Sequence, residues 1–301
     1  VDGATWDILD ELIAKGETPN FARLVETGFS DRLVTMLPTL SPLIWTTIAT
    51  GKTPDKHGVT DITLPDIPGL GGAVVDFPDF LAAGPSVKFL KASRILGKVP
   101  VASTNRKTKA LWNINTDFGL RTLVFDWWAT FPVDYINGCI VSDKAFPKRY
   151  EITDYNTIED RMEHYREPLT FPPELEEELL PYRRETLSMS LDEVRLYFDA
   201  DSAALEKINN VQGWKTKEYT TGIHMAYLKD KYYLQSALHL MEAEQWDCVM
   251  LYLNQIDILG HFFWSYYDPE IQPKRFGEGP FQEIVINSYK VMDKMLGQAL
   301  Q

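Results

Sequence analysis

Three stretches of the sequence place residues that could perform phosphate or metal chemistry at the ends of predicted strands or helices. Asp2 follows a single apolar residue, and an aspartate there ordinarily serves in a turn or a helix cap. Ser41 precedes Pro42 and an apolar run to Thr50, so we expect it at the N-cap of a helix that ends at Gly51. The free N–H groups of a helix N-terminus suit a phosphate, and a hydroxyl beside them can become a nucleophile, although most such serines only cap.

The third stretch ends at His261 and follows the most apolar segment of the sequence. Asp257 and His261 are four residues apart, so one helical turn would place both side chains on the same side. A carboxylate and an imidazole form a ligand pair suited to zinc, and less selectively to iron or manganese. We treat both as candidate metal ligands, with a hydrogen-bonded structural histidine as the alternative. His57 is expected to fix a loop instead.

The elements that must position these residues alternate between amphipathic helices and short apolar strands. This alternation predicts a mostly parallel sheet with helices on both faces, a three-layer αβα sandwich of the α/β class, with its chemistry at the carboxyl ends of the strands. The predicted strands cover residues 33–37, 121–126, 137–141 and 247–254. The predicted helices cover residues 10–15, 21–27, 42–50, 223–245 and 281–299.

The composition divides the chain into a core and two insertions. Residues 61–98 are rich in Pro and Gly, which predicts an irregular insertion. Residues 148–220 are rich in Glu, Arg and Tyr and lack long apolar strands, which predicts a helical, solvent-exposed cap. We therefore expect an α/β core from residues 1–147 and 221–301, with the cap between them.

The overall balance of the 301 residues is that of a globular protein, with 45% apolar and 24% charged residues. The formal net charge of −13 argues against a nucleic-acid polymer as partner, but it leaves room for a small anion, because a bound metal can reverse the field locally. No apolar run approaches the roughly 20 residues of a membrane helix. Cys139 and Cys248 are expected to be buried free thiols, which favours a reducing cytoplasm, while the absence of an initiator methionine leaves room for a removed leader.

Taken together, these segments resemble the alkaline phosphatase superfamily, on its type I phosphodiesterase and nucleotide pyrophosphatase side. The resemblance rests on Val1 to Ala4, Pro19 to Leu24, Ser41 to Gly51 with His57 and Gly58, Trp127 to Pro132 with Asn137 and Gly138, and Asp257 to His261. It covers the predicted core and leaves the two insertions unassigned.

The resemblance implies a hydrolase of small-molecule phosphoric esters that uses two divalent metal ions, usually zinc, with manganese or iron as alternatives. It places the nucleophile on Ser41, with Thr39 as the competitor if the loop is shifted. Asp2 would join Ser41 on one metal, and Asp257 with His261 would bind the other. A phosphoseryl intermediate would form on Ser41, and most of the catalysis would come from positioning and charge neutralisation.

Departures from the family pattern bear on substrate and activity. Trp45, Asp61 and Trp127 are the candidate substrate contacts, and Asp61 stands near the place where nucleotide pyrophosphatases tend to carry an asparagine, which weakens the case for a nucleotide. Members of the family carry a Ser-Asp-His-Gly segment and a later histidine downstream of the last predicted helix. We therefore expect a longer protein, and little activity from residues 1–301 alone. The alternatives are a phosphomonoesterase of the same superfamily and a catalytically incomplete domain that serves as a binding or interaction module.

Overall fold

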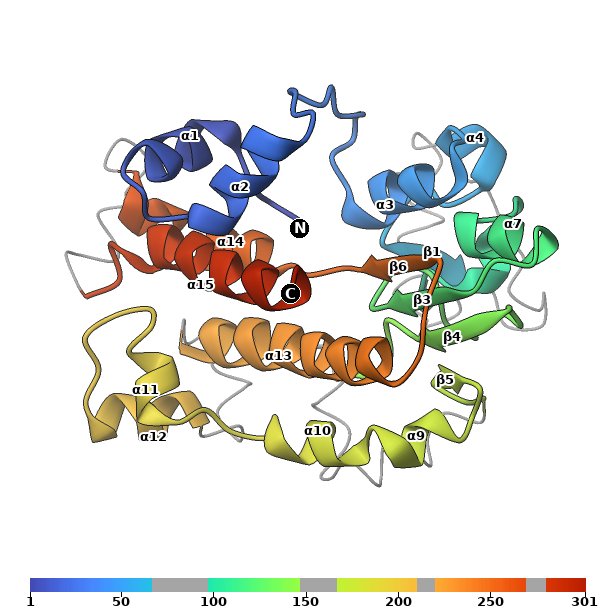
Figure 1. Ribbon diagram of the computed structural model, residues 1–301. Coiled ribbons are helices and arrows are strands. Elements are labelled where there is room, and N and C mark those ends of the chain that lie inside the picture. The colour runs from blue at the N-terminus through green and yellow to red at the C-terminus, as the bar shows by residue number, and fades with distance from the viewer. Residues whose placement is uncertain (67–96, 147–166, 210–219, 269–279) are drawn as a thin grey trace.

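A four-stranded sheet in the order β5-β4-β3-β6 forms the centre of the molecule (Figure 1). The computed structural model describes residues 1–66, 97–146, 167–209, 220–268 and 280–301. β3 (Thr122–Phe125) pairs in parallel with both β4 (Gly138–Val141) and β6 (Cys248–Leu251). β5 (Thr170–Phe171) pairs with β4 in the antiparallel sense. The predicted mostly parallel sheet is therefore confirmed.

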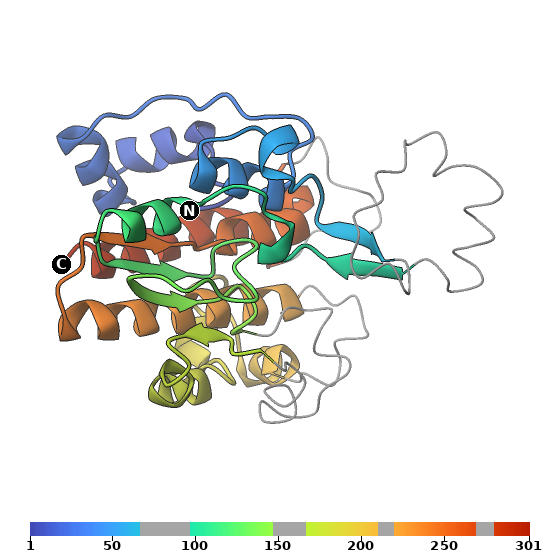
Figure 2. The same cartoon turned by 90° about the vertical axis from the view of Figure 1, so that its right-hand side faces the viewer.

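The two faces of this sheet pack into separate hydrophobic clusters, because side chains alternate along each strand. Leu123 and Phe125 join the large cluster that includes α13 (Thr220–Ala243), whereas Val124 joins a second cluster with residues of α3 (Ser41–Thr50) and α7 (Leu111–Asp117). Figures 1 and 2 show α13 on one side of the sheet and α3 and α7 on the other. This is the predicted three-layer αβα arrangement.

A group of four helices lies past the carboxyl end of β6 (Figure 1). These helices are α1 (Trp6–Ala14), α2 (Pro19–Thr27), α14 (Gln255–Tyr267) and α15 (Ile284–Ala299). α14 packs between α13 and α15, and α2 packs on α15. α1 begins four residues earlier than predicted, because the Thr5 hydroxyl accepts the Asp7 N–H and caps the helix.

The described part of the predicted cap is helical. It contains β5 and the short helices α9 (Leu175–Glu178), α10 (Leu180–Glu185), α11 (Leu191–Val194) and α12 (Ser202–Asn209). Its buried side chains belong to the same cluster as α13, and β5 extends the central sheet. Residues 147–166 and 210–219 lie outside the described residues, and the division into core and cap stays a prediction.

The predicted strand at residues 33–37 is wrong. Leu33, Val34 and Leu37 are 81%, 93% and 86% exposed in the loop between α2 and α3. An apolar run becomes a strand only when a neighbour satisfies its backbone hydrogen bonds. Within the described residues, no strand pairs with this segment.

The segment predicted to be an irregular insertion begins and ends in a β-hairpin-like pair. β1 (Thr63–Asp66) pairs antiparallel with β2 (Gly97–Pro100), and residues 67–96 between them lie outside the described residues. The short helices α4 (Pro54–His57) and η1 (Ser103–Asn105) flank this pair in the sequence.

Two other expectations concern the cysteines and membranes. Cys139 and Cys248 are free thiols, as predicted, and each is half-buried rather than fully buried. None of the helices in the described ranges has the length and apolar character needed to cross a membrane.

Candidate active site

Asp2 lies beside the carboxyl end of β6. Its backbone N–H donates to the Leu253 carbonyl at 2.8 Å, so the first residues run alongside the residues that follow β6. Gly3 has a φ of +76°, and a Cβ there would lie 2.6 Å from the backbone of Asp257. Because only glycine tolerates both this conformation and this approach, Gly3 allows the Asp2 segment to reach the start of α14.

Ser41 is the residue that meets Asp2. It is the first residue of α3, with Leu40 at the N-cap, so the predicted capping position of Ser41 is wrong by one residue. Its hydroxyl donates to Asp2 Oδ2 at 3.0 Å rather than accepting a helix N–H. Thr39 is exposed, and its side chain makes no hydrogen bond to any described residue.

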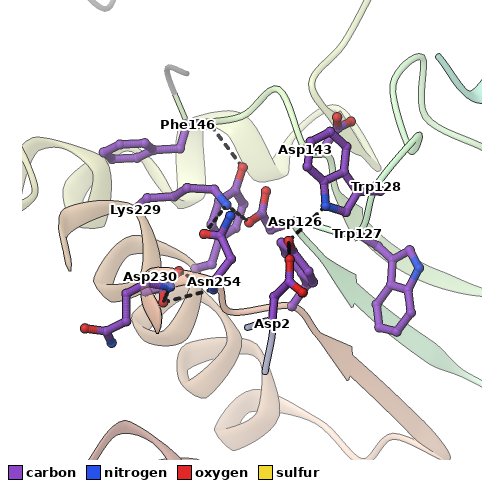
Figure 3. A network of polar contacts seen from close by, with 12 residues as sticks. Asp2, Asp126, Trp127, Trp128, Asp143, Phe146, Lys229, Asp230 and Asn254 are labelled. Carbon is purple, nitrogen blue, oxygen red and sulfur yellow. Dashed lines mark hydrogen bonds and ion pairs between the residues drawn. The ribbon is translucent and has the colours of Figure 1, made fainter. Parts of the chain in front are cut away.

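The same Asp2 oxygen is held by a second, directed hydrogen bond. The Tyr252 hydroxyl donates to Asp2 Oδ2 at 2.6 Å, and Trp128 Nε1 donates to the Tyr252 oxygen at 2.9 Å. An indole N–H can only donate, so the single proton of the Tyr252 hydroxyl points to Asp2. In Figure 3 the Asp2 and Trp128 side chains lie close together. The Asp2 carboxylate is therefore fixed before any ligand binds.

Asp257 and His261 lie in the first two turns of α14, facing the same side as predicted. His261 Nε2 is 3.5 Å from Asp257 Oδ1, and the two side chains are 78% and 29% exposed. Burial raises the pKa of the Asp257 carboxyl, and the nearby Asp2 carboxylate raises it further, against smaller opposing effects of His261 and Lys229. The structure thus brings Asp2, Ser41 and Asp257 to one place, with His261 at its edge.

Lys229 and Asp230, two buried charged residues of α13, lie beside this place (Figure 3). The Lys229 ammonium forms an ion pair with Asp126, the residue after β3, and donates to Asn254 Oδ1 at 3.0 Å. Asp230 accepts the backbone N–H groups of Asn254 at 3.1 Å and Gln255 at 2.9 Å, so it caps the start of α14. Burial raises the pKa of Asp230 to about 6. α13 therefore fixes the helix turn that carries Asp257.

This convergence of a strand-end aspartate, a helix-N-terminal serine and an Asp/His turn can be compared with known families. The family model for type I phosphodiesterase / nucleotide pyrophosphatase matches residues 1–301. The chain belongs to this family. No curated protein and no solved structure gave a match.

Membership confirms two predictions. The αβα fold is that of the alkaline phosphatase group, and the activity class is hydrolysis of phosphoric esters. A small-molecule phosphate ester fits the family as substrate.

Two of the three candidate substrate contacts lie next to the candidate site. Trp127 Nε1 donates to the Trp45 carbonyl at 3.0 Å, and the two rings meet edge to face with centroids 5.2 Å apart. The centroids of the Trp45 and Tyr252 rings are 4.8 Å apart, so the Trp45 and Trp127 pair lies beside the tyrosine that bonds Asp2. Asp61 is different: it is exposed, its carboxylate accepts the Ile62 N–H at 2.6 Å, and within the described residues it has no contact with the site.

His57 fixes a loop, as predicted. Its ring is buried, its Nδ1 accepts the Val59 N–H at 3.1 Å, and its Nε2 lies 2.9 Å from the Thr47 hydroxyl. Burial lowers the pKa of this imidazole. His57 thus ties the end of α4 to α3 and contacts none of the candidate ligands among the described residues.

Family membership implies that the site binds metal ions, and the candidate residues carry the kinds of side chain that bind divalent cations. Two carboxylates, a hydroxyl and an imidazole are donors that zinc accepts. Burial is the larger cause of the raised pKa of Asp257, and the nearby Asp2 carboxylate adds to it; a cation would offset this repulsion between the two carboxylates. The described ranges bring no group of three His, Cys, Asp or Glu side chains together, so each candidate pair offers part of a metal shell.

Sequence reasoning missed Tyr252, Lys229 and Asp230. A signal existed for Asp230: it falls in the buried stripe of α13, three residues from both Tyr227 and Tyr233. A charge on such a stripe indicates a buried partner or a functional role. Tyr252 gave no such signal, because an aromatic residue at a strand end is ordinary core.

Proposed function

We infer that this family member hydrolyses phosphoric diesters through a covalent phosphoseryl intermediate, with Ser41 as nucleophile. The observation that carries this proposal is the 3.0 Å hydrogen bond from the Ser41 hydroxyl to Asp2 Oδ2, at the N-terminus of α3. The carboxylate orients the hydroxyl, and the free N–H groups of the helix suit a phosphate oxygen. The nearby Trp45 and Trp127 rings are proposed to bound the substrate on this side.

Two divalent cations, most simply zinc with manganese or iron as alternatives, are part of the proposal. Asp2 and Ser41 would hold one, and Asp257 and His261 would hold the other. When bound, such a pair would lower the pKa of the serine hydroxyl and neutralise the phosphoryl charge.

The residues of the chain then perform two displacements. Ser41 Oγ loses its proton and attacks phosphorus, the bond from phosphorus to the leaving oxygen breaks, and the alcohol departs with a proton. Water next attacks the phosphoseryl group, the bond from phosphorus to Ser41 Oγ breaks, and the hydroxyl regains its proton. Asp2 holds Oγ through the hydroxyl proton before the first step and again after the hydroxyl is restored, and Tyr252 holds Asp2.

Metal removal tests this function directly. We expect the protein to hydrolyse bis-p-nitrophenyl phosphate faster than p-nitrophenyl phosphate. Dialysis against a chelator should abolish both activities, and added zinc should restore them. Release of p-nitrophenolate is the measurement. Faster cleavage of the monoester would favour the phosphomonoesterase alternative, and hydrolysis that survives the chelator would contradict the metal-dependent mechanism.

Tyr252→Phe is expected to weaken zinc binding by about 10- to 100-fold, because it removes the hydrogen bond that fixes a ligating carboxylate. The measurement is a competition titration of zinc against a chromogenic chelator, which does not depend on turnover. Tyr233→Phe is the matched control: among the described residues, this buried hydroxyl bonds only the backbone of Phe146 and Ser142. Equal zinc affinities in both variants would contradict the proposed role of Asp2 as a ligand held by Tyr252.

A further inference from the structure

The turn that follows β3 contains two residues other than glycine with left-handed backbone conformation. Asp126 and Ala129 have φ values of +54° and +57°. Alanine is disfavoured in this conformation, because its Cβ lies too close to the backbone. Such residues persist only where the surrounding structure holds them, and they concentrate at functional sites. These two bracket Trp127 and Trp128, so the strained backbone determines where both indole rings point.

Contacts within the protein hold this turn in its strained conformation. The Arg106 guanidinium, whose side chain is only 5% exposed, donates to the Ala129 carbonyl at 3.2 Å. The Thr130 hydroxyl donates to the Trp127 carbonyl at 2.6 Å and accepts the Asp143 backbone N–H at 3.0 Å. The turn is therefore fixed before any ligand binds.

The first two side chains of the turn reach the helices that carry candidate site residues. Asp126 forms the buried ion pair with Lys229, which donates to Asn254, the residue before α14 (Figure 3). Trp127 Nε1 donates at 3.0 Å to the carbonyl of Trp45 in α3. The turn is thus connected to both α14 and α3.

The third side chain, Trp128, reaches the end of β6. Its indole N–H donates to the Tyr252 oxygen at 2.9 Å, and the Tyr252 hydroxyl donates its proton to Asp2 Oδ2 at 2.6 Å. Because a donor on the oxygen polarises the O–H bond, the two hydrogen bonds strengthen each other. Asp2 Oδ2 also accepts the Ser41 hydroxyl at 3.0 Å. The hydrogen bonds that begin at Trp128 therefore end at the proposed nucleophile.

The two tryptophans of the turn differ in their exposure and in their partners. Trp127 is only 7% exposed, and its N–H bonds a backbone carbonyl, which satisfies the one polar atom of a core indole. Trp128 is half-buried, and its N–H bonds a side-chain hydroxyl that itself bonds Asp2. Packing accounts for the contacts of Trp127, whereas the N–H of Trp128 is directed at the site.

We propose that Trp128 is a positioning residue of the active site: the turn holds its indole N–H against Tyr252, and this hydrogen bond fixes the Asp2 carboxylate. The fixed carboxylate then orients Ser41 and binds its metal ion. The inference rests on the proposed function. In this assignment Trp128 contacts neither the ester nor the metal, and its effect passes through Tyr252. That effect must therefore disappear when the Tyr252 hydroxyl is absent.

A double-mutant cycle on zinc affinity tests this assignment, with the chromogenic chelator competition as the measurement. Trp128→Phe is expected to weaken zinc binding by about 2- to 10-fold, the equivalent of one net hydrogen bond. In the Tyr252→Phe background, the same substitution should leave the zinc affinity unchanged. Trp127→Phe is the matched control, because it removes an indole N–H from the same turn. Its effect should be the same in both backgrounds, since that N–H bonds Trp45.

A second measurement leaves Trp128 intact. Zinc added to the nitrogen-15-labelled wild-type protein should shift the indole N–H resonance of Trp128, because an ion on Asp2 changes the hydrogen bond that Asp2 accepts from Tyr252. In Tyr252→Phe this shift should be lost. The indole resonance of Trp127 is the internal reference and should respond equally in the two proteins.

The outcomes separate this inference from the function on which it rests. If the wild-type protein neither binds zinc nor hydrolyses bis-p-nitrophenyl phosphate, the proposed function fails and the inference fails with it. If it does both, and Trp128→Phe weakens zinc binding by the same factor with and without the Tyr252 hydroxyl, only the positioning role is overturned. If Trp128→Phe does not fold, the resonance decides: an equal zinc-dependent shift in wild type and Tyr252→Phe overturns the role.

Discussion

Ser41→Ala is expected to lower kcat for bis-p-nitrophenyl phosphate by about a thousandfold or more, because removal of a nucleophile eliminates the covalent pathway. The Ser41 hydroxyl donates to Asp2 Oδ2 at 3.0 Å. The side chain is small and half-buried, so the fold and Tm should be unchanged. The measurement is steady-state hydrolysis together with trapping of a phosphorylated peptide after acid quench.

Thr39→Ala is the control for this experiment, because it removes the competing hydroxyl two residues away. Its kcat should stay within twofold of wild type, since Thr39 is exposed and makes no side-chain hydrogen bond to the described residues. Ser41→Thr retains a hydroxyl and should keep part of the activity. Full activity in Ser41→Ala, or loss of activity in Thr39→Ala alone, would move the nucleophile away from Ser41.

Lys229→Met is expected to lower the free energy of unfolding by about 3–5 kcal/mol, because removing one partner of a buried ion pair leaves the opposite charge in a low-dielectric interior. The Lys229 and Asp126 side chains are only 7% and 1% exposed. The ammonium also donates to Asn254, which joins the end of β6 to α14. Urea denaturation followed by circular dichroism measures the loss.

Lys231→Met is the matched control on the same helix. Lys231 pairs with Glu193 at 2.7 Å, and both side chains retain contact with solvent, so its loss should cost about 1 kcal/mol or less. The double variant Lys229→Met with Asp126→Asn removes both charges and should recover part of the stability. If Lys229→Met and Lys231→Met lower the free energy of unfolding equally, the buried ion pair does not stabilise the fold more than the pair that contacts solvent.

The polar network around Lys229 and Tyr252 explains why the candidate site was only partly predictable. The Ser-Pro helix start and the Asp257–His261 spacing are local patterns. The geometry of one helix is enough to place Ser41 at a helix start and to place Asp257 and His261 on the same side. Tyr252 and Asp2 are 250 positions apart in the sequence, and their hydrogen bond exists only because the first residues lie beside the end of β6. The periodicity of the sequence does not indicate a hydrogen bond between such distant residues.

Asp61 and the predicted strand at 33–37 show the same limit in the opposite direction. Asp61 stood at a plausible distance from His57 in the sequence, but it bonds its own neighbour instead of the site. Leu33 and Val34 have strand-forming composition, yet the described sheet ends without them. Composition indicates a tendency to form a strand, whereas a strand forms only where a neighbouring strand can pair with it.

By itself, the sequence determined the main helices, the parallel strands of the sheet and the phosphoric ester hydrolase family, because periodicity and short motifs are properties of neighbouring residues. Only the tertiary structure decided that Ser41 bonds Asp2, that Asp257 lies close enough to feel the charge of Asp2, and that Tyr252 and the α13 charges support this place. These features depend on contacts between distant segments, and the packing of the whole chain sets such contacts.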